Sequence, residues 1–401
     1  MEGCPHAKDL DYWDSERLQD PFELFKELRD AECPISKSEM HGGYYIASRW
    51  EDVAAVAHDF DTYISGKGIS IPAFSEENGM FPQETDKPLH DEYRRVVAPR
   101  LRPKAVAELE PTMRRLTNGL IDEFIESGNC EITADLASPL VMLVFGPMIG
   151  LDEKYWAGLQ GIAFEMMYGE DKDEGTRQFL EFIKDQFEQR RENPREDLLT
   201  EMLDAEIVDG DETRKLTEHE RLQLVWGLSN AAGDTTSGLT TTAIWYLAKH
   251  PELKQRFVDD PDLVARNLDE FIRLNAVITV SRTVTAPTTL AGVDLVPEDK
   301  VAIMLGAAGR DERAFENPEE FQFDRKPNKH LAFGLGIHKC VGMHLARLQF
   351  KVTMEELLRR IPDYDITADE DVVITAGPAW QVRVLPLRFE AREREDAAVA
   401  A

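Results

Sequence analysis

Hydrophobic residues recur at helical spacing along most of the chain. Residues 15–31 (SERLQDPFELFKELRDA) predict a helix by this criterion. Residues 42–50 (GGYYIASRW) have the composition of a strand, and a further helix is expected to start in residues 51–59 (EDVAAVAHD). The chain therefore opens with short helices around a strand.

The middle of the chain predicts almost unbroken helix, from about residue 89 to 285. One helix stands out, Glu218–Lys249, which would be about 48 Å long at ~1.5 Å per residue and would end before Pro251. Residues 66–88 are rich in Gly and Pro and predict a long loop, a kind of segment that often carries function.

The last third of the chain adds short strands. Residues 286–304 contain two β-rich runs around turn residues, as in a hairpin, and residues 372–389 (VVITAGPAWQVRVLPLRF) also read as strands. No linker or repeat interrupts the sequence, so we expect one domain over residues 1–401, with loose termini at 1–12 and 390–401.

Composition narrows the class of protein. The chain has 401 residues, 42% of them hydrophobic, which is enough for a large core. A net charge of −30 disfavours a nucleic-acid-binding surface. The N-terminus has no apolar stretch of the length of a signal peptide or anchor, so we expect a cytoplasmic protein without a membrane partner. The four cysteines are too widely spaced to suggest a disulfide framework.

One cysteine lies in an unusual loop. Residues 333–342 read Phe-Gly-Leu-Gly-Ile-His-Lys-Cys-Val-Gly, and a predicted helix follows at once. Glycines around Cys340 let the backbone pass close to a flat group, and the N-terminus of a helix favours the thiolate form of a cysteine. A buried structural cysteine in a glycine-rich turn is the alternative, and Cys-x-Gly alone would not exclude it.

The complete pattern is more specific, because Phe333 and Gly336 precede Cys340 by seven and four residues and Gly342 follows it by two. This pattern resembles the haem-ligand loop of the cytochromes P450. The resemblance implies a mainly α cytochrome P450 fold, a triangular helical domain with a long central helix and small β-sheets. It also implies haem b with an axial thiolate from Cys340, and O2 as co-substrate.

The long helix carries a second motif, Asn230-Ala-Ala-Gly-Asp-Thr-Thr236. Gly and Thr are poor helix formers, and a Thr hydroxyl can bond back to an earlier carbonyl, so the helix is expected to open locally. The stretch resembles the family's oxygen-activation segment. By resemblance, Thr235 donates a hydrogen bond where oxygen binds, Asp234 passes protons in from solvent, and Ala231 and Ala232 lie against the haem.

Further positions match the family. Glu270 and Arg273 lie three apart on one helix face, and with Arg325 they match a buried structural network. Ala276 departs from the family, which usually has a proline soon after this helix, and this leaves the local outline of the pocket in doubt. The residues that by resemblance contact the haem, four of them propionate anchors, are His90, Arg94, Arg282, His338, Phe333 and Gly342.

Electrons must come from another protein, because the chain contains no flavin, nicotinamide or iron–sulfur motif. Residues 94–106 and 325–354 contain many basic residues and no acidic ones. In the family both segments border the thiolate side of the haem. We expect an acidic ferredoxin or flavodoxin to dock there on a monomer. The candidate docking residues are Arg100, Arg102, Lys339, Arg347 and Lys351.

The substrate pocket can be placed only by resemblance. Most of the residues expected there are apolar, so an apolar small molecule is the expected substrate, although each residue could equally belong to the core. They are Phe74, Met167, Gly227, Asn230, Val277, Ile278 and Trp380. The amide of Asn230 is the polar exception and needs a partner if buried.

These features favour a monooxygenase that takes electrons from NAD(P)H through separate redox proteins. Three alternatives remain: a peroxide-driven P450, a P450 that catalyses coupling or dehydration, and a haem-binding sensor without turnover. The pair Asp234-Thr235 argues against the first and the last.

Overall fold

Backbone contacts divide the computed structural model into two units that the chain enters alternately. The first contains Met1–Glu76, Gly238–Cys340 and Tyr364–Leu387, and the second contains Glu77–Ser237, Val341–Asp363 and Arg388–Ala401. The expectation of a single domain stays a prediction. The structure describes residues 9–15, 20–73, 79–156, 158–159, 161–162 and 171–395.

The first unit combines short helices with most of the strands. Its helical elements are α1 (Pro21–Asp30), η2 (Met40–Gly42), α2 (Trp50–His58), α11 (Pro251–Asp259), α12 (Asp262–Arg266), α13 (Leu268–Leu274), α14 (Leu305–Gly309), η7 (Gly336–His338) and η8 (Asp369–Asp371). Its strands are β1 (Ile35–Ser38), β2 (Tyr44–Ala47), β3 (Tyr63–Ile64), β7 (Thr279–Val284), β8 (Thr288–Leu290), β9 (Val293–Leu295), β10 (Lys300–Met304), β11 (Asp365–Ile366), β12 (Val373–Thr375), β13 (Gln381–Val384) and β14 (Pro386–Arg388).

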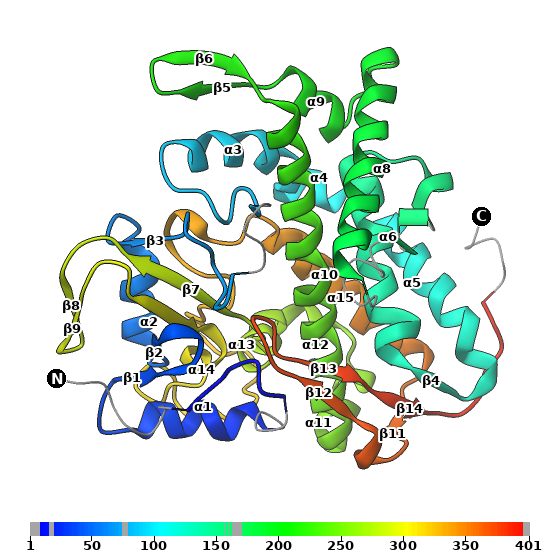
Figure 1. Ribbon diagram of the computed structural model, residues 1–401. Helices are drawn as coiled ribbons and strands as arrows, with labels where there is room; N and C mark the ends of the chain where they lie inside the picture. The colour runs from blue at the N-terminus through cyan, green and yellow to red at the C-terminus, as the bar shows by residue number, and fades with distance from the viewer. Residues whose placement is uncertain are drawn as a thin grey trace. The chain divides into compact units, whose positions relative to one another are not determined.

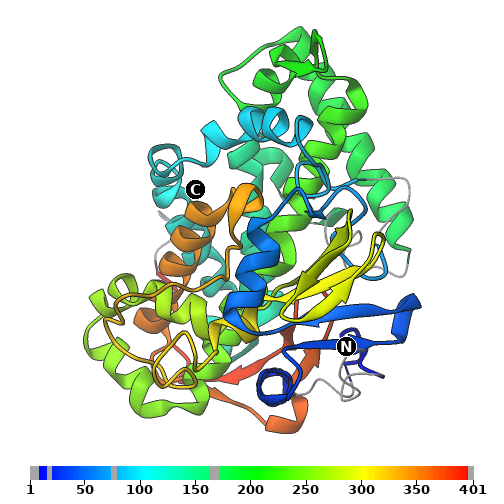
Figure 2. The same ribbon diagram turned by 90° about the vertical axis from the view of Figure 1, so that its left-hand side faces the viewer.

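A five-stranded sheet in the order β1-β2-β10-β7-β3 organises this unit. Strands β2 and β10 are parallel, with Ile46 opposite Ala302, whereas β10 and β7 are antiparallel. Because side chains alternate along a strand, Ala47 and Val301 pack with α2 on one face, and Ile46 and Ala302 pack with α1 on the other. Figure 2 shows α2 and α1, the latter seen end-on, on opposite sides of the strands.

The described residues of the second unit are mostly helical, with a few short strands. Its helical elements are α3 (Leu89–Val97), η3 (Ala98–Leu101), α4 (Pro103–Ala107), α5 (Glu110–Phe124), η4 (Ile125–Ser127), η5 (Thr133–Ala137), α6 (Ser138–Ile149), η6 (Glu153–Tyr155), α8 (Lys172–Glu192), α9 (Leu198–Asp204) and α15 (Met343–Arg360). Its strands are β4 (Asn129–Glu131), β5 (Glu206–Asp209) and β6 (Glu212–Lys215). The long helix α10 (Glu218–Lys249) supplies residues to both units and is drawn in green in Figure 1.

The long helix has the bounds that its pattern predicted, and a hairpin at β8 and β9 occurs where one was expected. Two other predictions were wrong in part. The helix expected over 15–31 begins at Pro21, because the Asp20 carboxylate accepts hydrogen bonds from the N–H groups of Phe22 and Glu23 and caps it there. The interval 89–285 also contains the hairpin β5–β6, whose two-residue turn Gly210-Asp211 begins with Gly210 at φ 63°, a Gly-Asp hairpin signal.

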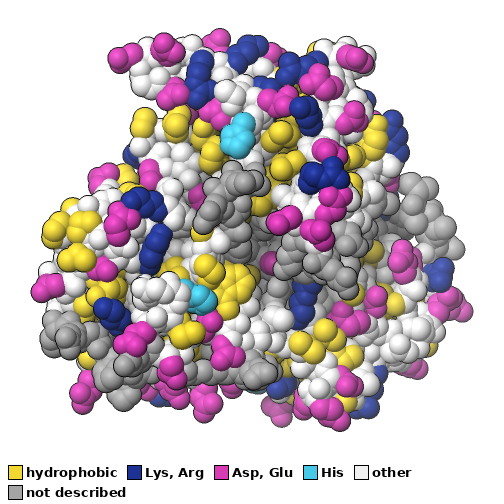
Figure 3. Space-filling model, viewed as in Figure 1, with side chains coloured by type: hydrophobic (Ala, Val, Ile, Leu, Met, Phe, Trp, Pro, Cys, Tyr) yellow, Lys and Arg dark blue, Asp and Glu magenta, His cyan; other side chains and the backbone are white. Residues whose placement is uncertain are grey.

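Acidic side chains are frequent on the face of the molecule that Figure 3 shows, with basic and hydrophobic side chains among them, in agreement with the net charge of −30. No helix within the described ranges is both long enough and apolar enough to cross a membrane.

Candidate functional site

Cys340 lies at the end of a loop that closes on itself. The backbone N–H of Cys340 donates to the carbonyl of Phe333 over 2.8 Å, and η7 (Gly336–His338) lies between them. Cys340 is exposed, and Phe333, Leu335 and Ile337 around it are half-buried. The loop therefore offers a thiol in the midst of apolar side chains, which suits a flat hydrophobic group with a metal at its centre.

Two glycines make this loop possible. Gly334 and Gly336 have φ of 68° and 71°, in the left-handed region that side chains disfavour. A Cβ at Gly336 would lie 2.7 Å from the carbonyl oxygen of Ala57 at the end of α2, whereas at Gly334 the nearest atom is 3.7 Å away. Only glycine lets the loop approach α2 so closely at residue 336. On the far side of Cys340, Gly342 is the N-cap residue of α15.

The three residues of the predicted network lie together in the first unit. Arg273 donates to both carboxylate oxygens of Glu270, over 2.9 and 2.8 Å, and Arg325 Nε lies 3.0 Å from each of the same oxygens. Burial alone would raise the pKa of Glu270, but the hydrogen bonds from Arg273, Gln322 and Arg325 hold it below its usual value. The network joins α13 to the segment before the cysteine loop.

Two predicted propionate anchors belong to the same unit. Arg282 lies in β7, is buried, and donates to the carbonyl of Ser281 over 2.8 Å. His338 ends η7 two residues before Cys340 and is half-buried. Both are therefore held by ordered backbone.

The oxygen-activation segment lies in the part of α10 that belongs to the second unit. Thr235 Oγ1 donates to the carbonyl of Ala231 over 2.7 Å, and Ser237 Oγ donates to that of Gly233 over 2.8 Å. Asp234 is half-buried, Ala232 is half-buried and Ala231 is exposed. The local opening expected here is absent, since residues 218–249, all of them described, are α-helical throughout. Hydroxyl groups supplement the backbone ladder at this point without breaking it.

The other two predicted anchors lie one turn apart on α3. His90 is fully buried, and its Nδ1 lies 2.9 Å from the Asp91 carboxylate. Burial lowers the pKa of His90 despite the opposing effect of Asp91, so its ring is neutral at pH 7. Arg94 is half-buried on the same helix face.

The predicted docking cations differ in their surroundings. The guanidinium of Arg100 binds the carboxylate of Glu201 over 2.7 Å, and Lys351 Nζ lies 3.2 Å from Glu110. Each basic segment contains no acidic residue, but Glu201 and Glu110, which lie outside these segments in the sequence, pair with Arg100 and Lys351. Arg100 and Lys351 therefore do not present the uncompensated charge that a docking surface needs, and this corrects their prediction. Among the other candidates, Arg102 and Lys339 are exposed and Arg347 is half-buried.

Three expected pocket residues belong to the first unit. Val277 is buried, and its carbonyl accepts from the N–H of Trp380 over 2.7 Å. Ile278 forms a bridge with Ala379. The ring of Trp380 packs 5.5 Å from that of Phe22 and is buried, so Trp380 belongs to the core between α1 and β13.

Of the remaining expected pocket residues, Phe74 and Met167 lie outside the described residues, and Gly227 and Asn230 lie on α10. Asn230 finds its partner within the helix, where its Nδ2 donates to the carbonyl of Trp226 over 2.9 Å. The prediction that Gly227 lines the substrate pocket needs correction. A Cβ there would lie 2.4 Å from the carbonyl oxygen of Phe81, so Gly227 serves as the contact point for residues 80–83.

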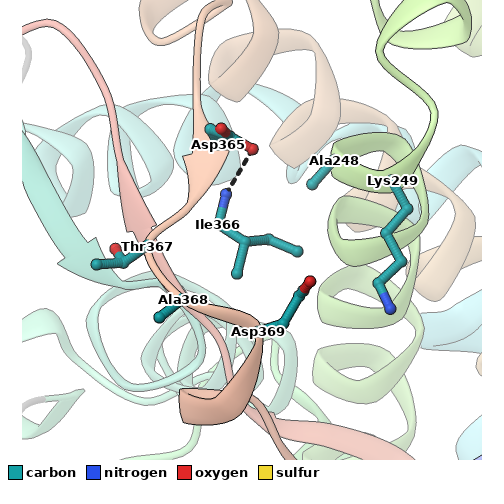
Figure 4. Close-up of a pocket in the computed structure, with 7 residues that line it drawn as sticks. All are labelled: Ala248, Lys249, Asp365, Ile366, Thr367, Ala368 and Asp369. Carbon is teal, nitrogen blue, oxygen red and sulfur yellow. Dashed lines mark hydrogen bonds between the residues drawn. The ribbon is translucent and has the colours of Figure 1, made fainter.

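One surface pocket, of about 350 Å3, lies in the first unit and has none of the predicted residues in its lining. Figure 4 shows it between the end of α10 and residues 365–369, with Lys249 and Asp369 on facing sides. Asp365 Oδ1 accepts from the N–H of Ile366 there over 2.9 Å. Its polar lining does not suit an apolar substrate.

Known proteins match this chain along most of its length. A family model described as Cytochrome P450 matches residues 168–362. Probable cytochrome P450 127A1 of Sinorhizobium fredii is 30% identical over 332 residues, which are 81% of this chain and 78% of that protein. The chain belongs to the cytochrome P450 family. Cytochrome P450 CYP107DY1 of Priestia megaterium is similar too, at 26% identity over 94% of this chain and 98% of its own.

Solved structures agree with this assignment. The cytochrome P450 CYP109Q5 from Chondromyces apiculatus has a TM-score of 0.86 and 30% identity, and the alignment covers 96% of this chain and 99% of that one. The predicted fold is therefore confirmed, and the protein is a cytochrome P450 monooxygenase. Members of the family use haem held by a cysteine thiolate together with O2.

The chemistry of the predicted residues fits a haem, and each unit contributes some of them. The first unit supplies an exposed thiol in an apolar loop, which only glycine allows to form at residue 336. It also supplies a buried cation, Arg282, which could neutralise a propionate. The second supplies the Asp234-Thr235 pair on α10 and the anchors on α3.

Sequence reasoning missed a polar cluster at the start of α10. The Glu220 carboxylate accepts from the Tyr93 hydroxyl over 2.6 Å, from both terminal nitrogens of Arg214 over 2.8 Å, and from the N–H of Thr217 over 2.7 Å. This ties the hairpin β5–β6 and α3 to α10. Thr217 and Glu220 form a capping box, which the sequence Thr-Glu-His-Glu could have revealed.

Proposed function

We propose that this P450 binds haem b through the Cys340 thiolate and oxidises an apolar small molecule with electrons from a ferredoxin-type partner. The observation that supports it most is the loop of Cys340, held by its bond to Phe333 and by Gly336 against Ala57. Thiolate-ligated haem, when bound, supplies the activation of O2. The residues of the chain bind that group, exclude water and deliver protons.

Proton delivery is assigned to Asp234 and Thr235. The Thr235 proton points to the carbonyl of Ala231 over 2.7 Å, so the hydroxyl must rotate before it can donate elsewhere. Asp234, at the preceding position of the helix, is half-buried and can exchange protons with solvent. The Thr235 hydroxyl would orient a proton, and the Asp234 carboxylate would then supply the next proton from solvent. The two side chains therefore form a short proton relay.

By the family resemblance, the residues that receive the electron donor are assigned as Arg102 and Arg347 of the second unit and Lys339 of the first. Arg102 and Lys339 are exposed, which suits brief contact with an acidic ferredoxin or flavodoxin. Arg100 and Lys351 are excluded because Glu201 and Glu110 offset their charge. The net charge of −30 would otherwise repel such a partner.

The apolar side chains that precede β7 are the reason for assigning an apolar substrate. Val277 is buried and Ile278 is half-buried, and both precede a strand that also carries Arg282. Apolar lining with few polar groups selects for apolar ligands by burial of their surface.

The haem assignment is tested by the absorbance of the reduced carbon monoxide complex. We expect the red-shifted band of thiolate ligation in the wild-type protein and its loss in Cys340→Ala, with Cys130→Ala as the matched control that keeps it. Cys130 is buried in the second unit. Retention of the band in Cys340→Ala would overturn the assignment.

The partner surface is tested by the rate of haem reduction with a plant- or bacterial-type ferredoxin, its reductase and NADH. The double variant Lys339→Glu and Arg347→Glu should reduce this rate at low salt and flatten its salt dependence, whereas Lys154→Glu should leave both unchanged. The side chain of Lys154 is 67% exposed, and Lys154 is not among the residues assigned to the electron donor. Equal rates and equal salt dependence in all three proteins would refute the surface.

A further inference from the structure

The N-terminal segment Asp9–Ser15 is fixed to the sheet of the first unit. The carbonyl of Leu10 accepts hydrogen bonds from Ser38 Oγ over 2.7 Å and from the Tyr44 hydroxyl over 2.6 Å. Leu10 and Tyr12 are buried. This anchoring places the next residue, Trp13, at a defined position on the surface.

Tyr12 and Trp13 both bind one residue of the loop predicted at 66–88. The N–H of Ile71 donates to the Tyr12 hydroxyl over 2.6 Å, and the indole N–H of Trp13 donates to the carbonyl of Ile71 over 2.7 Å. Both backbone groups of Ile71 are therefore held by aromatic side chains from the N-terminal segment.

The same segment binds a second loop, between β12 and β13. The N–H of Ala376 donates to Ser15 Oγ over 3.0 Å. The indole ring of Trp13 lies against Gly377, where a Cβ would meet two ring carbons at 3.2 Å, and Gly377 has a φ of 137°. Trp13 thus joins two loops that are about 300 residues apart in sequence.

Both loops cover the segment that precedes and starts β7. The N–H of Ser281 donates to the carbonyl of Ile69 over 2.7 Å, and that of Thr279 donates to Pro378 over 2.8 Å. Val277 and Ile278 are bonded to residues 379–380 in turn. The two loops joined by Trp13 therefore define one side of the apolar lining proposed for the substrate.

We propose that Trp13 is a positioning residue that determines which substrates this P450 admits. It holds the Ile71 loop and the Gly377 loop together and so excludes bulky molecules from the lining next to β7. Trp13 is 37% exposed, so it can move without opening the core that Leu10 and Tyr12 form. This inference rests on the proposed function, because it takes Val277 and Ile278 as pocket residues.

The test uses two azole probes that bind haem iron and shift its Soret band, imidazole as the small probe and 1-tritylimidazole as the bulky one. In the haem-loaded full chain, Trp13→Ala should tighten binding of 1-tritylimidazole by about fivefold or more, the effect of one hydrogen bond and a ring contact. Imidazole binding should stay the same. Trp13→Phe keeps a ring but no N–H, and its affinity for 1-tritylimidazole should lie between those of wild type and Trp13→Ala. The matched control Val296→Ala removes an apolar side chain that is 57% exposed and should change neither affinity.

Hydrogen exchange separates the possible failures. Peptides that contain residues 69–73 and 376–380 should exchange faster in Trp13→Ala and at the wild-type rate in Val296→Ala. Faster exchange with unchanged affinity for both probes would make Trp13 a purely structural residue and overturn the proposal, as would unchanged exchange. Absence of the red-shifted carbon monoxide band in wild type would instead refute the proposed function. Hydrogen exchange would still show whether Trp13 holds the two loops.

Discussion

Arg325 Nε lies 3.0 Å from both carboxylate oxygens of Glu270, in a site where both side chains are buried. Removal of Arg325 takes these hydrogen bonds from the buried Glu270, which Arg273 still pairs. The cost is therefore that of lost hydrogen bonds to a charged group, about 1.5–3 kcal/mol. We expect Arg325→Ala to lower the free energy of unfolding by this amount in a urea titration. Arg325→Lys should lose less, since it keeps the charge but not the planar geometry. Equal stability of Arg325→Ala and wild type would contradict this account.

The cluster around Glu220 predicts a pH dependence. Burial alone would raise the pKa of Glu220, but the hydrogen bonds from Arg214, Tyr93 and Thr217 outweigh it and hold the pKa at about 2, below its usual 4.5. A lowered pKa contributes stability that is present above pH 4.5 and is lost as pH falls towards 2, at most about 3 kcal/mol. The difference in unfolding free energy between wild type and Glu220→Gln should therefore shrink from pH 6 to pH 3. A constant difference would show that Glu220 acts through packing alone.

The cysteine loop offers a matched pair of glycine substitutions. Gly334→Ala meets only the strain of a positive φ, about 1–2 kcal/mol, because its nearest neighbour is 3.7 Å away. Gly336→Ala adds a clash with the carbonyl of Ala57. We expect Gly336→Ala to lower the fraction of protein that shows the red-shifted carbon monoxide band much more than Gly334→Ala. Similar fractions would mean that the contact with α2 does not shape the loop.

A second glycine pair tests the contact between α10 and residues 80–83. Gly227→Ala would place a Cβ 2.4 Å from the carbonyl oxygen of Phe81, whereas Gly119→Ala on α5 meets nothing within 4 Å. The first should lower the thermal unfolding midpoint by several degrees, and the second should leave it unchanged or raise it, since Ala is the better helix former by about 1 kcal/mol. Calorimetry of both variants provides the measurement.

Thr235 allows the proposed relay to be tested by its products. Without the hydroxyl, protons are delivered without orientation, so Thr235→Ala should consume NADH with less product per electron pair. Thr235→Ser keeps a hydroxyl that can bond to Ala231 and should retain most of the coupling. Measurement of NADH, peroxide and product in the same reaction distinguishes the variants. Full coupling in Thr235→Ala would remove Thr235 from the relay.

Strong local patterns made the long helix predictable. Apolar spacing and Pro251 predicted a helix over roughly Glu218–Lys249, the bounds that α10 has, because both signals lie within the helix or directly after it. The hairpin β5–β6 was overlooked because it is short and carries five charged residues among its eight strand positions, which obscures the alternation. The contact of Gly227 with Phe81 depends on residues 146 apart and has no local signal.

Non-local contacts also explain what the sequence could not predict about the site. The Glu270 network and the loop of Cys340 were assigned by resemblance, since Glu270 and Arg325 are 55 residues apart. The bonds of Trp13 to Ile71 and of Ser15 to Ala376 span 58 and 361 residues. No periodicity records such pairs, so the bonds of the N-terminal segment to the two loops emerged only from the three-dimensional arrangement.

The parallel pairing of β2 with β10 has a consequence for biosynthesis. Tyr45 is opposite Val301, so about 250 residues must leave the ribosome after β2 before its partner strand exists, which takes roughly 12–50 s at ~5–20 residues per second. During that time β2 has only the short strand β1 beside it and presents an unsatisfied apolar edge. The nascent chain is therefore most exposed to misassociation early in synthesis, and chaperone dependence of the yield should diminish once β10 has been translated.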